Sequence, residues 1–148
     1  GFSIGATGAM LSLTAIGGAF GKFGCGPLGD RIGQRAAVIW TEILTAIFLV
    51  LVVSAGYYWM FPVVFFMGAF LNGTSSVLYA LVPRLTTKVS LNRGFGFYYT
   101  TTLATSGVAP LAVGLLGDSI GLHGTYYVMA GILLATIPLM SLVVPRSG

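Results

Sequence analysis

Charged residues are scarce in this chain. It has 148 residues, of which 7% are Asp, Glu, Lys or Arg and 56% are hydrophobic. A soluble domain carries about 25% charged residues. Seven basic and three acidic side chains therefore cannot cover a surface of this size with polar groups. The shortage excludes an ordinary soluble domain and predicts an integral membrane protein whose main partner is the lipid bilayer.

Residues that carry chemistry are equally few. Cys25 is the sole cysteine and the chain has one histidine, so no intrachain disulfide and no multi-cysteine metal site can form. A membrane-embedded enzyme needs a cluster of His, Asp, Glu or Cys near one boundary, and the sequence offers none. No glycine-rich phosphate loop ending in Lys-Ser or Lys-Thr is present. We therefore predict no enzyme activity, no metal site and no cofactor.

Five apolar segments of about 20 residues are each long enough to cross a bilayer as a helix. They predict an all-α membrane protein with spans at residues 2–23, 36–55, 58–81, 95–116 and 125–144. Gly17 and Gly21 form a GxxxG pair in the first segment, which lets two helix backbones approach closely.

The basic residues predict the orientation. In a five-span arrangement they all fall on one side, which the positive-inside rule makes cytoplasmic; they are Lys22, Arg31, Arg35, Arg84, Lys88, Arg93 and Arg146. The N-terminal residue is then outside and the C-terminus inside. Because these residues lie in short loops and not along one face, the net charge of +4 predicts no nucleic-acid partner.

Polar residues mark one face of two predicted spans. They recur at helical spacing in the third segment (Asn72, Ser75, Ser76, Tyr79) and in the fourth (Tyr98, Thr101, Thr102, Thr105). Polar groups in membrane helices avoid lipid, so these faces are candidates for lining a solute pathway. The alternative is that the hydroxyls bond carbonyls of their own helix or join neighbouring helices.

Two further features allow two interpretations each. Gly107, Pro110 and Gly114 weaken the fourth segment, which predicts either a hinge or a static bend. Glu42 is the one carboxylate predicted inside a span. It suggests proton coupling by its location, or an ion pair with Arg31 or Arg35.

The segment from Gly26 to Arg35, Gly-Pro-Leu-Gly-Asp-Arg-Ile-Gly-Gln-Arg, predicts a tight charged turn between the first two spans. It resembles the signature loop of the major facilitator superfamily, roughly G-x-L-a-D-r-x-G-r-k, through Gly26, Leu28, Asp30, Arg31, Gly33 and Arg35. The sequence departs from that pattern at Gln34, because a basic residue is usual at this position. A weaker copy follows at residues 114–121, Gly-Leu-Leu-Gly-Asp-Ser-Ile-Gly, without the arginine.

The resemblance implies a secondary transporter of two six-helix bundles in a bacterial inner membrane. Such a protein moves a small organic solute or drug by alternating access, as efflux proteins do, and the signature loop acts as a gating turn. Counting from that loop, the chain corresponds to the last five helices of the C-terminal half. Its partners would then be the missing N-terminal half and a small-molecule substrate. The chain opens on Gly1 with no Met or charged leader, and we expect an internal start. The alternative function is a non-transporting assembly or receptor partner in the membrane.

Overall fold

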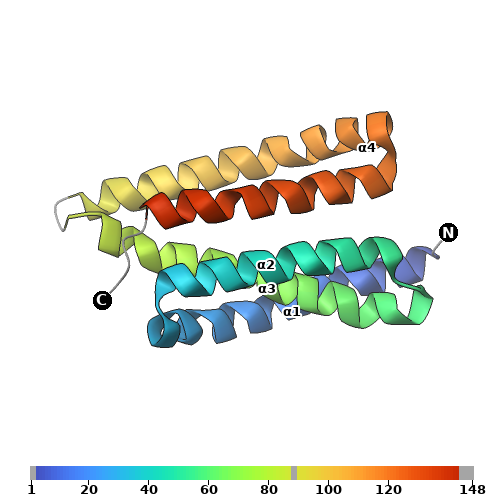
Figure 1. The fold of residues 1–148 in the computed structure, drawn as a ribbon, viewed down its shortest axis with the longest axis horizontal. Coiled ribbons are helices and arrows are strands. Elements are labelled where there is room, and N and C mark those ends of the chain that lie inside the picture. Colours follow the sequence, from blue (N-terminus) through green and yellow to red (C-terminus); the bar gives the residue numbers. More distant parts are fainter. Residues whose placement is uncertain (1–2, 88–89, 144–148) are drawn as a thin grey trace.

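The computed structural model describes residues 3–87 and 90–143, and the regular structure within these ranges is helical. Helix α1 covers Ile4–Ile32, α2 Gln34–Ser54, α3 Tyr57–Leu85 and α4 Leu91–Val143 (Figure 1). All four are long and apolar enough to cross a membrane. Some predicted features lie outside the described residues. They are Lys88, Arg146 and the two outermost span limits, residues 2 and 144.

Helix α4 is two helices joined at a sharp bend. Gly121 has φ 76° and ψ 165°, which no helix contains. Figure 1 shows the chain doubling back there, so that a first arm (residues 91–120) and a second arm (122–143) run side by side in opposite directions. These arms contain the fourth and nearly all of the fifth predicted segment. The bend falls between those two segments because glycine alone adopts this backbone conformation without a Cβ clash.

The prediction of a loop from Gly26 to Arg35 is wrong in its extent. Residues 26–32 continue α1, and α2 begins at Gln34, so the turn consists of Gly33 alone, with φ 89° and ψ 140°. Pro27 lies inside the helix, although its ring removes one backbone hydrogen bond. Continuing the helix keeps the backbone groups of residues 26–32 paired, apart from the one donor that Pro27 lacks.

The two motif copies share this geometry. Gly33 and Gly121 are the residues with positive φ in the described part of the chain, and each is the last glycine of its copy. In both places a helix ends at an isoleucine, the glycine reverses the chain and a new helix begins at once. The repeat therefore encodes a one-residue helical reversal at opposite ends of the bundle (Figure 1).

Helices α1 and α3 pack along a seam of glycines. A Cβ on Gly17 or Gly21 would collide with the backbone carbonyls of Phe65 and Ala69, and one on Gly68 with that of Thr14. The GxxxG pair of α1 is thus used within this chain, where it brings α1 close against α3.

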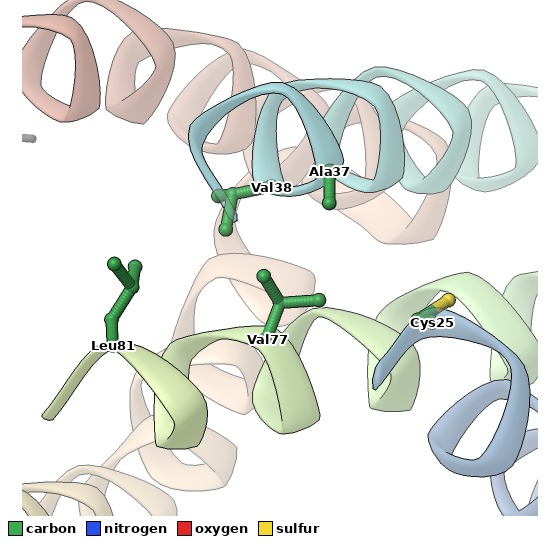
Figure 2. Packing of buried hydrophobic residues seen from close by; sticks show 5 residues of the cluster. All are labelled: Cys25, Ala37, Val38, Val77 and Leu81. Atoms are coloured by element: carbon green, nitrogen blue, oxygen red, sulfur yellow. The ribbon is translucent and has the colours of Figure 1, made fainter. Parts of the chain in front are cut away.

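A small apolar core joins the first three helices near the α1–α2 turn. Figure 2 shows its members, Cys25 from α1, Ala37 and Val38 from α2, and Val77 and Leu81 from α3. The second arm of α4 packs on α2 farther along, through Ala46, Leu49 and Ala130.

The first arm of α4 is the least covered part of the molecule. Every residue from 99 to 108 is exposed. The arm meets α3 near its own beginning, where a Cβ on Gly94 would lie 2.6 Å from the Thr86 side chain. In Figure 1 the second arm separates it from α2 over most of its length.

Candidate functional site

A cavity of about 420 Å³ lies between residues of α1, α3 and the first arm of α4. Seven residues line it: Lys22, Ser75, Ser76, Tyr79, Tyr98, Tyr99 and Thr102. Each of them carries a hydroxyl or an ammonium group. In a chain with so few polar side chains, this concentration identifies the cavity as the candidate functional site, which we call the Lys22 cavity.

Aromatic contacts hold α3 against α4 at this cavity. The Tyr79 ring lies 4.9 Å from Phe95, 6.3 Å from Tyr98 and 6.0 Å from Tyr99, measured between ring centroids. The Tyr98 hydroxyl donates a hydrogen bond of 3.4 Å to the Ser75 carbonyl. Because these are the contacts between the two helices at this depth, they set the shape of the cavity wall.

The structure brings together five of the eight predicted pathway residues: Ser75, Ser76, Tyr79, Tyr98 and Thr102. Ser75 and Thr102 also bond carbonyls of their own helices, as the alternative interpretation of the hydroxyls expects. Thr101 and Thr105 are exposed on the first arm and do not line the cavity.

Asn72 lies elsewhere. Its Nδ2 donates a 3.0 Å hydrogen bond to the Gly68 carbonyl. Its amide packs against α1, where a Cβ on Gly18 would lie 2.6 Å from Nδ2. In this structure Asn72 therefore belongs to the α1–α3 seam and is not a cavity residue.

Lys22 and Tyr99 are cavity residues that the sequence did not single out. Lys22 was expected at the end of a span that stops at Phe23, but α1 continues to Ile32. It precedes the Gly33 turn by eleven residues, which is about 16 Å along a helix that rises about 1.5 Å per residue. A signal was available in the sequence: the three glycines and one proline between Lys22 and Gly33 need not end a membrane helix.

The motif at the end of α1 forms a small polar network. Gln34 Nε2 donates a 3.1 Å hydrogen bond to Asp30 Oδ1, and the same oxygen lies 3.5 Å from Arg84 Nη2 in the last turn of α3. Gln34 is buried and lies over Gly29, where a Cβ would come 2.7 Å from Gln34 Oε1. Asp30 thus ties the α1–α2 turn to the end of α3.

The other motif residues are placed around this network. Gly26 has open space on its Cβ side, and Leu28 and Arg31 are exposed in the last turns of α1. Arg35 lies in the first turn of α2 and Arg93 in the first turn of α4. Together with Arg31 and Arg84 they occupy one end of the bundle, which we call the basic end (Figure 1). Lys22 is the one described basic residue that lies well inside a helix.

Helix α4 is continuous through Gly107, Pro110 and Gly114, since its one non-helical residue is Gly121. Pro110 and Gly114 line a second cavity of about 890 Å³ between α2, α3 and the two arms. This cavity is mainly apolar, with Asp118 at its wall. A wide apolar space beside Pro110 leaves room for the arm to move, which is compatible with a hinge but equally with a static bend.

Glu42 is half-buried in α2. Its Oε2 atom is inaccessible to solvent and accepts no hydrogen bond from any residue that the structure describes. No ion pair joins Glu42 to Arg31 or Arg35 within the described ranges. The group is therefore an isolated acid at about 12 Å from the start of α2.

No cluster of three His, Cys, Asp or Glu side chains in residues 3–87 and 90–143 is placed to hold a metal ion.

Comparison with known proteins places this geometry in context. The model of the family described as Major Facilitator Superfamily matches residues 1–148. The chain is 29% identical to a protein named multidrug resistance protein MdtG from Serratia proteamaculans (strain 568), over 93% of this chain and 34% of that protein. It therefore spans about a third of that relative's length. No solved structure matches the chain.

Proposed function

We propose that this chain, which belongs to the Major Facilitator Superfamily, forms one bundle of a secondary transporter that moves a small organic solute or drug by alternating access. The family consists of membrane transporters and not of enzymes. The name of the Serratia relative supports drug efflux as the direction and substrate type.

The Lys22 cavity carries the proposal. Seven polar or charged side chains converge there in a chain that is 56% hydrophobic. Polar groups inside a membrane are costly unless they face water, a partner or a solute. Tyr99 and Thr102 of the cavity lie in the exposed stretch of the first arm, which a second bundle of the same transporter would cover.

The proposed topology has five crossings, α1, α2, α3 and the two arms of α4, with the basic end in the cytoplasm. The clustering of Arg31, Arg35, Arg84 and Arg93 at that end supports this orientation. We place the chain in the C-terminal half of the transporter, in the inner membrane of a bacterium.

The Asp30 network is the proposed gate. Asp30 pairs with Arg84 across two helices whose basic ends would separate or close during alternating access. Glu42 is the proposed coupling acid, because an unpaired carboxyl inside a membrane helix can take up and release a proton. Gly107, Pro110 and Gly114 are the proposed hinge of the first arm.

Thiol accessibility tests the proposal against the alternative of a non-transporting assembly partner. In full-length protein carrying Cys25→Ala, cysteine is placed singly at Ser76 and Thr102, which line the cavity. Ile47→Cys is the control, since Ile47 is an exposed apolar residue of α2, a helix that does not line the cavity. A membrane-impermeant thiol reagent should label the two cavity positions in inside-out vesicles and leave the control unlabelled.

The reason is that a thiol must ionise to react, and it does so in a hydrated pathway but not in lipid. Uniformly unreactive positions would favour the assembly partner and overturn the transport proposal.

A further inference from the structure

The one charged residue of the Lys22 cavity is a cation with no acidic side chain beside it among the residues that the structure describes. The chain has three acidic residues, and none of them lines the cavity. Asp30 pairs with Arg84, Glu42 lies on α2, and Asp118 borders the apolar cavity between the arms of α4. The Lys22 cavity therefore carries a net positive charge.

The position of Lys22 makes that charge unusual. It lies about 16 Å from the Gly33 turn, at a depth similar to that of Ser76 on α3 and of Thr102 on α4, which lie about 14 and 17 Å inside the basic ends of their own helices. Four arginines sit at the basic end, where they meet water and lipid headgroups. The Lys22 side chain is exposed in this chain. A lysine at this depth of a membrane helix is costly in lipid, so it is expected to face water, a partner or a ligand.

The rest of the cavity wall suits a flat organic body. Three tyrosine rings, Tyr79, Tyr98 and Tyr99, stand within 6.3 Å of one another between centroids. Such rings offer apolar faces together with hydroxyl groups at their tips. A volume of about 420 Å³ lies within the usual range of about 300–1,000 Å³ for small-molecule sites.

We infer that the Lys22 cavity binds an amphipathic organic anion, whose carboxylate, sulfonate or phosphate pairs with the Lys22 ammonium and whose ring system packs on the tyrosines. This inference rests on the proposed transport function and names its substrate class. The chemistry of one anionic group on an apolar body is shared by a soluble solute and an anionic lipid, and the proposal is the soluble solute.

Equilibrium binding tests it. Full-length protein in phosphatidylcholine nanodiscs is titrated with 2-naphthoate and, separately, with 2-naphthylmethylammonium, which has a similar ring system and the opposite charge. The variants are Lys22→Gln, which removes the charge, Lys22→Arg, which keeps it, and Arg93→Gln, which removes a charge at the basic end.

The wild-type protein should bind the carboxylate and not the ammonium. Lys22→Gln should weaken carboxylate binding by at least about tenfold, the value of one charge-assisted hydrogen bond. Lys22→Arg should stay within about threefold of wild type, and its binding shows that the fold tolerates change at this position. Arg93→Gln should match wild type, because Arg93 does not line the cavity.

Three results would overturn the inference. The first is equal binding of carboxylate by Lys22→Gln and wild type, the second is equal binding of the two probes, and the third is no carboxylate binding by wild type. Adding phosphatidylglycerol to the discs separates the two anion sources. Displacement of naphthoate by this lipid, lost in Lys22→Gln, would assign the cavity to a lipid headgroup and reject the soluble solute.

Uptake measurements in proteoliposomes distinguish failure of this inference from failure of the proposed transport function. If the protein takes up a neutral or cationic compound and Lys22→Gln does not change that uptake, the proposed transport function stands and the inferred anionic substrate is rejected. If naphthoate binding depends on Lys22 but no probe is taken up, the inferred anion site stands and the proposed transport function is rejected.

Discussion

The turn at Gly33 and the turn at Gly121 are two copies of one backbone solution with different surroundings. Each follows a Gly-x-x-Gly-Asp segment, and each glycine has positive φ with an extended ψ. At the first copy Asp30 accepts a hydrogen bond from Gln34 and pairs with Arg84. At the second, Asp118 borders a largely apolar cavity.

The difference separates two roles inside one motif. The last glycine produces the reversal in both copies, because only glycine accepts that backbone conformation. The aspartate gains partners only where a third helix ends beside the turn and supplies an arginine. The motif thus encodes a turn by itself, and an ion-paired contact only in its first setting.

The largest effect should come from the last glycines. Gly33→Ala and Gly121→Ala each place a Cβ in a region of φ and ψ that is essentially restricted to glycine. Each should lower the free energy of unfolding by about 1–3 kcal/mol. Gly26→Ala and Gly114→Ala are the matched controls, since both positions are helical with no neighbouring atom within 4 Å of a Cβ. Alanine there should be neutral or slightly stabilising.

Thermal unfolding of the full-length protein in detergent measures all four variants. Equal losses at the first and last glycines would show that positive φ is not the reason for the losses, and would contradict the common backbone role assigned to Gly33 and Gly121.

A smaller effect should separate the middle glycines. Gly29→Ala brings a Cβ to 2.7 Å from Oε1 of the buried Gln34 side chain, whereas the nearest atom to a Cβ on Gly117 is Thr125 Oγ1 at 3.9 Å. Gly29→Ala should lower stability by about 1 kcal/mol, because a flexible amide can give way at moderate cost. Gly117→Ala should be neutral.

Gln34→Ala provides the internal check on that assignment. In the double variant with Gly29→Ala the collision is removed, so the two losses should not add. Additive losses in the same unfolding experiment would place the cause outside the Gly29–Gln34 contact.

The smallest effect on stability should come from the aspartates. The Asp30 and Arg84 side chains are 69% and 56% exposed, so Asp30→Asn or Arg84→Gln should each change stability by less than about 1 kcal/mol. Under the proposed gate, each should nevertheless lower the transport rate in proteoliposomes, and the double variant should be no slower than either one. Asp118→Asn is the control without an ion pair. Unchanged transport in Asp30→Asn would reject the gate and leave the first copy a plain turn.

Much of the fold was predictable from the sequence. The apolar segments predicted helical regions, and the first motif copy predicted a turn between the first two spans, which the structure confines to Gly33. These features are local: a run of about 20 apolar residues and a glycine are recognisable without neighbours. The extent of α1 was not predicted, because the glycines and the proline were interpreted as a loop although the helix continues through them to Ile32.

The candidate site was predictable in part. Five of eight pathway residues line the Lys22 cavity, since period and polarity assign residues to a helix face. Asn72 does not line the cavity, because α1 approaches α3 closely at Gly18 and the Asn72 amide packs there.

The sequence by itself thus determined a membrane protein, its apolar helical segments and its family resemblance, because each depends on composition or on residues close together in the chain. Only the tertiary structure decided that Lys22 faces a tyrosine cavity, that Arg84 reaches Asp30 and that the GxxxG pair of α1 packs on α3. The physical reason is that a helical period says which residues share a face, whereas the facing partner depends on how far each helix continues and which helix packs against it.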